Sequence, residues 1–271
     1  MFRTRLLSGI VLVILAVALI ISGGWILLGS TLIISCIGMY ELYRVFKIEK
    51  SSFAIISYLA AVVYFLNLGF NFLDDRLLIL IAYMILLMCI YVFSYPKYTA
   101  DNVMTAFFGL FYVAIMLSFV YEIRMLDKGV YLAFLIFLCS WGCDTCAYCV
   151  GKLCNMTIGT HKMAPILSPK KSIEGAVGGV VGSALLTAIY GCVFKTQMNM
   201  DTNEIIILAL IAAVSGLISM IGDLTASAIK RNHDVKDYGN LIPGHGGILD
   251  RFDSMIITAP IIYYLAVYFL V

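Results

Sequence analysis

Long runs of apolar residues separated by short polar segments dominate the hydropathy pattern of this chain. A bilayer core about 30 Å thick requires roughly 20 mainly apolar residues per helix, and most of the runs are close to that length. Backbone exposed to lipid must form its hydrogen bonds within each segment, so the runs predict helices and give no sign of a sheet. The predicted spans are about 6–22, 25–43, 53–72, 77–94, 103–122, 130–150, 174–194, 204–229 and 254–271.

The composition supports a membrane-embedded chain. Apolar residues make up 62% of the 271 positions and charged residues 13%, and the mean hydropathy is +1.01. Soluble domains contain about one half apolar and one quarter charged residues, so this chain needs a non-aqueous solvent for its surface. We therefore predict an all-α integral membrane protein with about nine transmembrane helices. Only Ser22-Gly23-Gly24 separates the first two spans, which leaves a helical hairpin and one long kinked helix as alternatives.

The placement of lysine and arginine predicts the orientation, because cytoplasmic loops are enriched in both. With the N-terminus in the cytoplasm, fourteen of the 18 such residues, Arg3 and Arg5 among them, fall in inside loops. The remaining four are Arg76, Arg124, Lys128 and Lys195. We therefore expect a cytoplasmic N-terminus, with the polar loops 151–173 and 231–253 also on the cytoplasmic side. The net charge of +2 says little about partners, and no nucleic-acid partner is expected.

Polar residues break the apolar pattern in three places, around Asp144, around Asp223 and along 230–253. An ionised carboxylate at the centre of a spanning helix costs roughly 2.5–3.5 kcal/mol on insertion scales, so such residues usually face a cavity or a partner. Asp144 lies deep in the sixth span, and Asp223 lies near the end of the eighth. Snorkelling of helix-end charges explains these two short acidic side chains poorly. For Lys230 and Arg231 that explanation is as good as a functional one.

Helical periodicity places the polar residues on common faces, because residues three, four and seven apart lie on one side of a helix. The sets are Asp144, Tyr148 and Gly151 in the sixth span and Asp223, Ser227, Lys230 and Arg231 in the eighth. Asp250 and Asp253 would project together if the last helix begins at that point. Carboxylates and basic residues alternate along 230–253, and carboxylate oxygens facing a phosphate are how Mg²⁺ is normally held.

Two loops have the composition of phosphate-binding segments. After Pro243, the turn of Gly244, His245, Gly246 and Gly247 lets backbone amides approach an anion closely. An ordinary Gly-Pro loop at the interface is the alternative. The other loop carries Lys162, Lys170 and Lys171 ahead of Ser172 and Gly175. Ser172 and Gly175, at the end of this loop, predict the start of the seventh helix. The free amides and the dipole at a helix start favour an anion.

The C-terminal stretch resembles the signature of the phosphatidate cytidylyltransferase (CDP-diacylglycerol synthase) family. The matching runs are Ser227-Ala-Ile-Lys230-Arg231, Lys236-Asp237 and Pro243-Gly-His245-Gly-Gly-Ile-Leu-Asp250-Arg251-Phe-Asp253. Two upstream blocks, Asp144-Thr-Cys-Ala-Tyr148 and Ser168-Pro-Lys-Lys-Ser-Ile-Glu174-Gly175, also resemble blocks of that family. The resemblance covers residues 141–254, and Ser172 and Ile173 depart from the Thr and Trp often found there.

The resemblance implies a reaction, which is the conversion of CTP and phosphatidate to CDP-diacylglycerol and pyrophosphate in phospholipid biosynthesis. It also implies a requirement for Mg²⁺, with a second cation left open, and a homodimer in the lipid bilayer. We expect the protein in the inner or plasma membrane of a bacterium, with its active site facing the cytoplasm. Residues 1–129 would then form about five N-terminal spans, and residues 130–271 the catalytic helices and loops.

The roles of the matching residues are hypotheses. For the metal we predict Asp223, Asp250 and Ser227, followed by Asp253 and Asp237. For the phosphates we predict Lys230, Arg231, Lys236 and Arg251, with Gly244, His245, Gly246 and Gly247 shaping the triphosphate loop. Lys170 and Lys171 would close over that loop, and Ser168, Ser172, Glu174 and Tyr148 would also contact substrate. Asp144 is either a further metal ligand or a cytosine contact.

Three alternatives stay open. A CTP-dependent lipid kinase of the polyprenol type would transfer the γ-phosphoryl group, and a membrane transporter would use intramembrane carboxylates for ions. Cys143, Cys146 and Cys149 have the spacing of a metal site, but a helix spreads them around nearly half its circumference. We interpret these cysteines as small residues that pack between helices.

Overall fold

The computed structural model describes residues 2–270. The side chains of residues 1–5 lie outside the description, including those of Arg3 and Arg5, which were counted for the orientation. The chain forms two compact units. Unit 1 contains Met1–Tyr121 and His233–Arg251, and unit 2 contains Glu122–Asn232 and Phe252–Val271. The predicted division after residue 129 stays a prediction.

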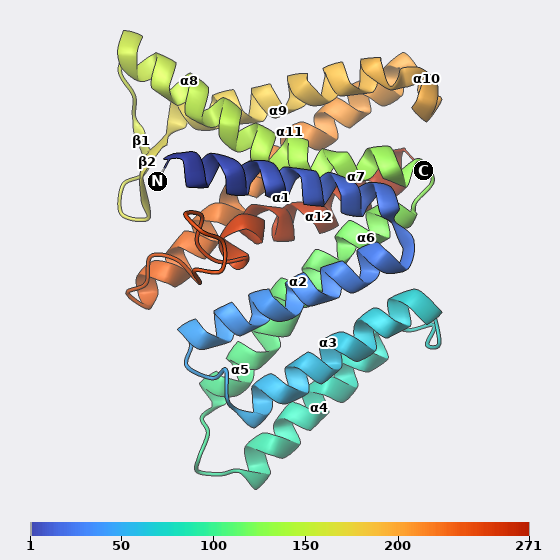
Figure 1. Cartoon of the computed structure of the whole chain (residues 1–271), viewed down its shortest axis with the longest axis vertical. Coiled ribbons are helices and arrows are strands. Elements are labelled where there is room, and N and C mark those ends of the chain that lie inside the picture. The colour runs from blue at the N-terminus through green and yellow to red at the C-terminus, as the bar shows by residue number, and fades with distance from the viewer. Residues whose placement is uncertain (1, 271) are drawn as a thin grey trace. The chain divides into compact units, whose positions relative to one another are not determined.

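Unit 1 is built from helices and one long loop (Figure 1). The helices are α1 (Phe2–Ser22), α2 (Gly24–Val45), α3 (Ser52–Phe70), α4 (Leu77–Phe93), α5 (Ala100–Gly109), the π-helical η1 (Leu110–Ile115) and the first half of α6 (Met116–Met125). The chain reverses between α1 and α2, where Gly23 and Gly24 have φ angles of 60° and 48°. Glycine adopts such angles without steric cost. The first two spans therefore form a helical hairpin, which decides between the two alternatives (Figure 1).

Unit 2 contains the remaining helices and a short hairpin. Its elements are α7 (Gly129–Phe137), the π-helical η2 (Leu138–Gly142), α8 (Cys143–Thr157), β1 (Lys162–Ala164), β2 (Ser168–Ser172), α9 (Ile173–Val193), α10 (Lys195–Met198), α11 (Thr202–Asn232) and most of α12 (Leu249–Phe269). The antiparallel strands pair Lys162 with Ser172 and Ala164 with Ser168. Apolar periodicity could not reveal strands this short and polar, and we had predicted no strand.

Among the residues that the structure describes, seven helical runs are long and apolar enough to cross a membrane. They are Gly24–Val45, Ser52–Phe70, Ala100–Met125, Gly129–Thr157, Ile173–Val193, Thr202–Asn232 and Leu249–Phe269, with Leu6–Ser22 and Leu77–Phe93 as shorter apolar helices. Each of the nine predicted spans coincides with one of these nine segments, which confirms an all-α, multi-pass membrane protein. The cytoplasmic N-terminus stays a prediction.

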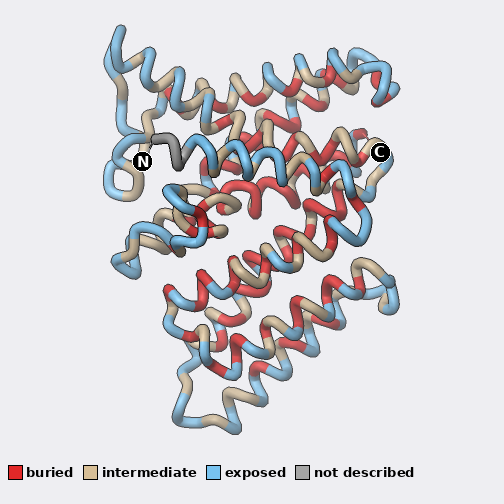
Figure 2. Tube along the Cα trace, viewed as in Figure 1, coloured by how far each residue is buried: buried red, intermediate tan, exposed pale blue. Residues whose placement is uncertain are grey.

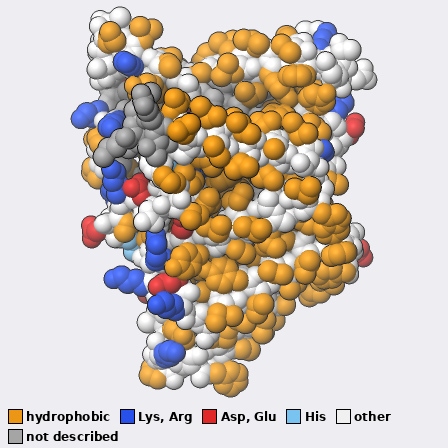
Figure 3. Space-filling model, viewed as in Figure 1, with side chains coloured by type: hydrophobic (Ala, Val, Ile, Leu, Met, Phe, Trp, Pro, Cys, Tyr) orange, Lys and Arg blue, Asp and Glu red, His pale blue; other side chains and the backbone are white. Residues whose placement is uncertain are grey.

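Burial along α9 has the pattern expected in lipid. Val177, Val181 and Leu185 are exposed, while Gly179 and Ser183 of the same helix are buried. Large apolar side chains therefore point outward and small ones inward, as in membrane helices that pack closely. Figure 2 shows exposed outer faces along the helices, and Figure 3 shows hydrophobic side chains covering much of the visible surface.

Helices α8 and α9 approach each other through small residues. A Cβ added to Gly182 would lie 2.5 Å from Cβ of Cys146, and one added to Gly179 would lie 3.0 Å from Sγ of Cys143. No cluster of three or more potential metal ligands among histidine, cysteine, aspartate and glutamate occurs within the described residues. Packing between helices is thus confirmed for Cys143 and Cys146, whereas Cys149 is exposed.

Candidate active site

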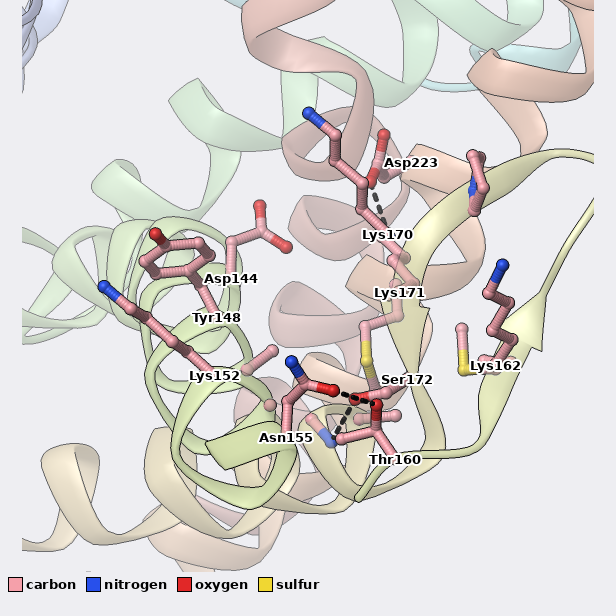
Figure 4. Close-up of a pocket in the computed structure, with 17 residues that line it drawn as sticks. Asp144, Tyr148, Lys152, Asn155, Thr160, Lys162, Lys170, Lys171, Ser172 and Asp223 are labelled. Carbon is pink, nitrogen blue, oxygen red and sulfur yellow. Dashed lines mark hydrogen bonds and ion pairs between the residues drawn. The ribbon is translucent and has the colours of Figure 1, made fainter. Parts of the chain in front are cut away.

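A polar pocket of about 610 Å³ lies in unit 2 (Figure 4). Its walls come from α8, the β1–β2 hairpin, the start of α9 and the second half of α11. The polar lining residues are Asp144, Tyr148, Lys152, Asn155, Thr160, Lys162, Lys170, Lys171, Ser172 and Asp223. Two carboxylates and four lysines therefore share one cavity, which gives it an excess of positive charge.

One wall is a single face of α8. Asp144, Tyr148 and Gly151 all line the pocket, so the face predicted from their spacing is confirmed. Lys152 follows Asp144 by eight residues and lines the same wall, although we had not predicted it as a site residue. The spacing that groups the other three would also have identified Lys152. The π-helical η2 ends at Gly142, two residues before Asp144, and such π-helical turns are frequent at functional sites.

An ion pair joins opposite charges of the pocket. Nζ of Lys171 on β2 lies 2.5 Å from Oδ2 of Asp223 on α11. The two side chains are 22% and 31% exposed, whereas the Nζ atom of Lys171 itself is buried. Figure 4 shows Asp144 on α8 and Asp223 on α11 both directed toward the pocket interior. A predicted metal ligand, Asp223, is therefore in direct contact with Lys171, which was predicted to close over the triphosphate loop.

The hairpin that carries Lys170 and Lys171 is fastened to the first turn of α9. The backbone N–H of His161 donates to both carboxylate oxygens of Glu174 at 3.1 and 3.0 Å, and Nδ1 of His161 lies 2.7 Å from Oε1. Ser172 caps α9 by accepting a hydrogen bond of 3.0 Å from the Gly175 N–H, which confirms the predicted helix start. Glu174 thus holds the hairpin in place, and its predicted contact with substrate stays a prediction.

Other predicted residues of unit 2 lie outside the lining of this pocket. Ser227 and Lys230 follow Asp223 along α11, and all three belong to one continuous helix, as their spacing predicted. Asp253 is buried on α12, where a Cβ added to Gly222 of α11 would lie 3.0 Å from its carbonyl oxygen. The predicted roles of these residues, and those of Arg231 and Ser168, stay predictions.

The loop of unit 1 contains the glycine-rich turn. Gly244 and Gly246 have φ angles of 78° and 88°, which favour glycine, and the His245 N–H donates to the Ile242 carbonyl at 2.9 Å. Helix α12 begins at Leu249, so Asp250 and Asp253 share its first turns, as predicted. The roles of Gly244, His245, Gly246 and Gly247 toward triphosphate, and those of Lys236, Asp237 and Arg251, stay predictions.

Asp250 is bonded to the loop that precedes it. Its Oδ2 accepts hydrogen bonds from the N–H groups of Tyr238 at 2.8 Å and Gly247 at 2.9 Å, and the residue is only 6% exposed. This carboxylate therefore organises the loop. Asp223 belongs to unit 2, so whether Asp223 and Asp250 share a metal stays a prediction.

Two residues of α2 also hold this loop, and we had not predicted either of them. The carboxylate oxygens of Glu41 accept hydrogen bonds from the N–H groups of Ile248 at 3.1 Å and Leu249 at 2.8 Å. Nη2 of Arg44 donates to the Tyr238 carbonyl at 2.6 Å. The position of Glu41 inside an apolar span was the sequence signal that could have identified it as a site residue.

The fold and the pocket define the class of protein. A multi-pass membrane chain that gathers four lysines and two carboxylates in one cavity has the charge needed to hold phosphate groups together with a divalent cation. No serine or cysteine nucleophile is needed when a substrate brings its own phosphate oxygen. These features are those of a membrane enzyme that acts on phosphate-bearing substrates.

Sequence comparison specifies the class further. The chain belongs to the cytidylyltransferase family, whose model matches residues 3–269. It is 32% identical over 276 residues to the phosphatidate cytidylyltransferase of Bacillus subtilis (strain 168), with 98% of each chain covered. It is 31% identical over 293 residues to the enzyme of the same name from Synechocystis, covering 97% of this chain and 96% of the relative. The resemblance found in residues 141–254 therefore extends over the whole chain.

Proposed function

We propose that this protein is a phosphatidate cytidylyltransferase, which forms CDP-diacylglycerol and pyrophosphate from CTP and phosphatidate in phospholipid biosynthesis. The observation that carries the proposal is the pocket of two carboxylates and four lysines in a chain of this family. A phosphate oxygen of phosphatidate attacks the α-phosphorus of CTP, and the bond between the α-phosphorus and the bridging oxygen breaks. Pyrophosphate leaves with the electron pair of that bond.

The lysines of the pocket address the main obstacle to this reaction. Both substrates are anions, so they repel each other, and charge builds up on the leaving pyrophosphate. Lys162, Lys170 and Lys171 from the hairpin and Lys152 from α8 can neutralise this charge on two sides of the cavity. Catalysis of this kind depends on positioning and electrostatics and needs no covalent intermediate.

Mg²⁺ fits the donor set of the pocket. Magnesium is usually held by one or two carboxylates together with substrate phosphates. Asp144 and Asp223 line the same cavity and offer hard oxygen ligands, so these two residues would hold the ion. The ion would neutralise phosphate charge and orient the leaving group. Ligation by Asp250, Ser227 or Asp253, a second cation and a homodimer stay predictions.

We propose that the site faces the cytoplasm of a bacterial cell, at the plasma membrane. The relatives described above are bacterial, and CTP is available on that side. The bias of lysine and arginine toward the loops 151–173 and 231–253 supports the same orientation.

Labelled nucleotide tests the proposed reaction directly. We expect purified protein with phosphatidate and CTP labelled at the α-phosphorus to incorporate label into lipid, and we expect a chelator to abolish the incorporation until Mg²⁺ is restored. CTP labelled at the γ-phosphorus should yield labelled pyrophosphate and unlabelled lipid. Transfer of the γ-label into lipid would instead indicate the lipid kinase, and no turnover of either label would favour the transporter.

Replacing Lys171 by Met should weaken the enzyme without unfolding it. The substitution removes the cation that contacts Asp223 and keeps a long apolar stem. A hydrogen bond to a charged group contributes about 1.5–3 kcal/mol, so we expect kcat/KM for CTP to fall about 10-fold to 100-fold. Steady-state kinetics measure the effect. Lys195→Met, at the exposed start of α10, is the control and should match the wild type. Equal activities of Lys171→Met and Lys195→Met would contradict the role of Lys171.

A further inference from the structure

Glu41 is a buried carboxylate that the proposed reaction does not use. It lies in the second half of α2, inside a predicted membrane span, and is 4% exposed. Burying an ionised carboxylate costs free energy unless its oxygens are paired or hydrogen-bonded. A carboxylate at this depth therefore points to a specific partner, and the structure supplies one in the loop of unit 1.

That partner is the start of α12. Oε1 of Glu41 accepts a hydrogen bond from the Ile248 N–H at 3.1 Å, and Oε2 accepts one from the Leu249 N–H at 2.8 Å. The first amides of a helix have no partner within the helix and attract an anion. Such amides often bind phosphate, but here a side chain of the protein occupies them. Glu41 thus fixes the point where the loop ends and the helix begins.

The loop also closes tightly around the Glu41 side chain. A Cβ added to Gly239 or to Gly247 would collide with the Glu41 carboxylate, so only glycine allows this approach. Gly247 is the last residue of the glycine turn formed by Gly244, His245, Gly246 and Gly247. The same carboxylate therefore touches both ends of the segment 239–247, and that segment contains the turn.

Neighbouring contacts make this a connected network. Arg44, one helical turn after Glu41, donates to the Tyr238 carbonyl at 2.6 Å. Asp250 accepts from the Tyr238 and Gly247 N–H groups at 2.8 and 2.9 Å. Three side chains thus hold the backbone of residues 238–249, and two of them come from α2.

We infer that Glu41 is a positioning residue, which holds the glycine turn and the start of α12 in the conformation that the reaction requires. The inference rests on the proposed function, because the turn belongs to the predicted triphosphate site. It gives α2, in the half of the chain that consists mainly of apolar spans, a positioning role in the reaction. Glu41 acts through the loop and does not contact substrate.

Replacing Glu41 by Gln tests this role. Glutamine has nearly the same size, but it has one acceptor oxygen for the two backbone amides that Glu41 binds. Its NH₂ group would therefore face one of the two N–H donors. We expect amide hydrogen exchange to become faster in peptides covering 238–250 and to stay unchanged in α11. We also expect kcat/KM for CTP to fall about 10-fold while the thermal unfolding midpoint is preserved. Glu41→Asp, which keeps both acceptors, should restore part of the activity. Glu49→Gln, just beyond α2, is the matched control and should behave like the wild type.

The exchange measurement separates this inference from the proposed function. It needs no substrate, so a wild-type protein without cytidylyltransferase activity would overturn the function while the loop could still be tested. Unchanged amide exchange of the loop in Glu41→Gln would overturn the positioning role. A loss of activity fully accounted for by a lower thermal unfolding midpoint would overturn it as well. If Glu41→Gln does not accumulate, Gly247→Ala displaces the same carboxylate from the loop side and should give the same exchange pattern. Failure of both variants to accumulate, beside a normal Glu49→Gln, would mean a role in folding alone and would overturn the inference.

Discussion

Replacing Asp223 by Asn is expected to reduce CDP-diacylglycerol formation at least about 100-fold, the size of effect seen when a charge-stabilising group is removed from an active site. The substitution keeps the size of the side chain but removes the charge that pairs with Lys171. It also removes one of the two carboxylates that would hold Mg²⁺ in the pocket. Because Asp223 is partly exposed and lies on a long helix, the variant should insert and fold normally.

The measurement is transfer of α-label from CTP to lipid at several Mg²⁺ concentrations. Asp127→Asn provides the control, since Asp127 is an exposed aspartate of unit 2 between α6 and α7. If the loss reflects weaker metal binding, raising the Mg²⁺ concentration should restore part of the activity of Asp223→Asn. Wild-type activity in Asp223→Asn at limiting Mg²⁺ would contradict the metal assignment.

Replacing Asp250 by Asn is the second change expected to lower activity at least about 100-fold. Asp250 is buried and is a predicted metal ligand in the loop, and its Oδ2 already accepts hydrogen bonds from Tyr238 and Gly247. The carbonyl oxygen of asparagine can accept the same two bonds. We therefore expect the loop to keep its conformation while the negative charge is lost. Activity and amide exchange should respond differently in this variant.

Exchange of peptides 238–250 and α-label transfer distinguish the two tasks of Asp250. Asp250→Asn should retain slow exchange and lose activity, whereas Asp250→Ala should lose both. The control is Asp234→Asn, since Asp234 is exposed and has a φ of 55°, an angle that asparagine tolerates. Full activity in Asp250→Asn would show that this residue only organises the loop, and its place among the metal ligands would then be wrong.

The helices could be predicted well because their signals are local. Runs of apolar residues marked the nine apolar helical segments of the described residues, and a three-to-four-residue spacing placed Asp144 and Tyr148 on one face of α8. Ser172 marked the start of α9 because a capping residue acts on amides of its own helix. In each case the interacting groups are close in sequence.

The contacts of the site could not be predicted in the same way. Lys171 and Asp223 lie on different elements, and nothing near either residue specifies the other. The hairpin that carries Lys171 is too short for a periodic pattern. Glu41 and Ile248 are 207 residues apart, and an acidic residue in an apolar span looks the same whether it binds a metal, a lysine or a helix start.

The sequence by itself determined that this is a multi-pass helical membrane protein, where its helices lie, and which polar residues share a helix face. Hydropathy and helical periodicity carry that information, since each depends only on neighbouring residues. Only the tertiary structure decided which carboxylates meet lysines in the pocket and which hold backbone amides. The physical reason is that a buried carboxylate must find donors or cations, and how the helices and loops pack decides which of these come within reach.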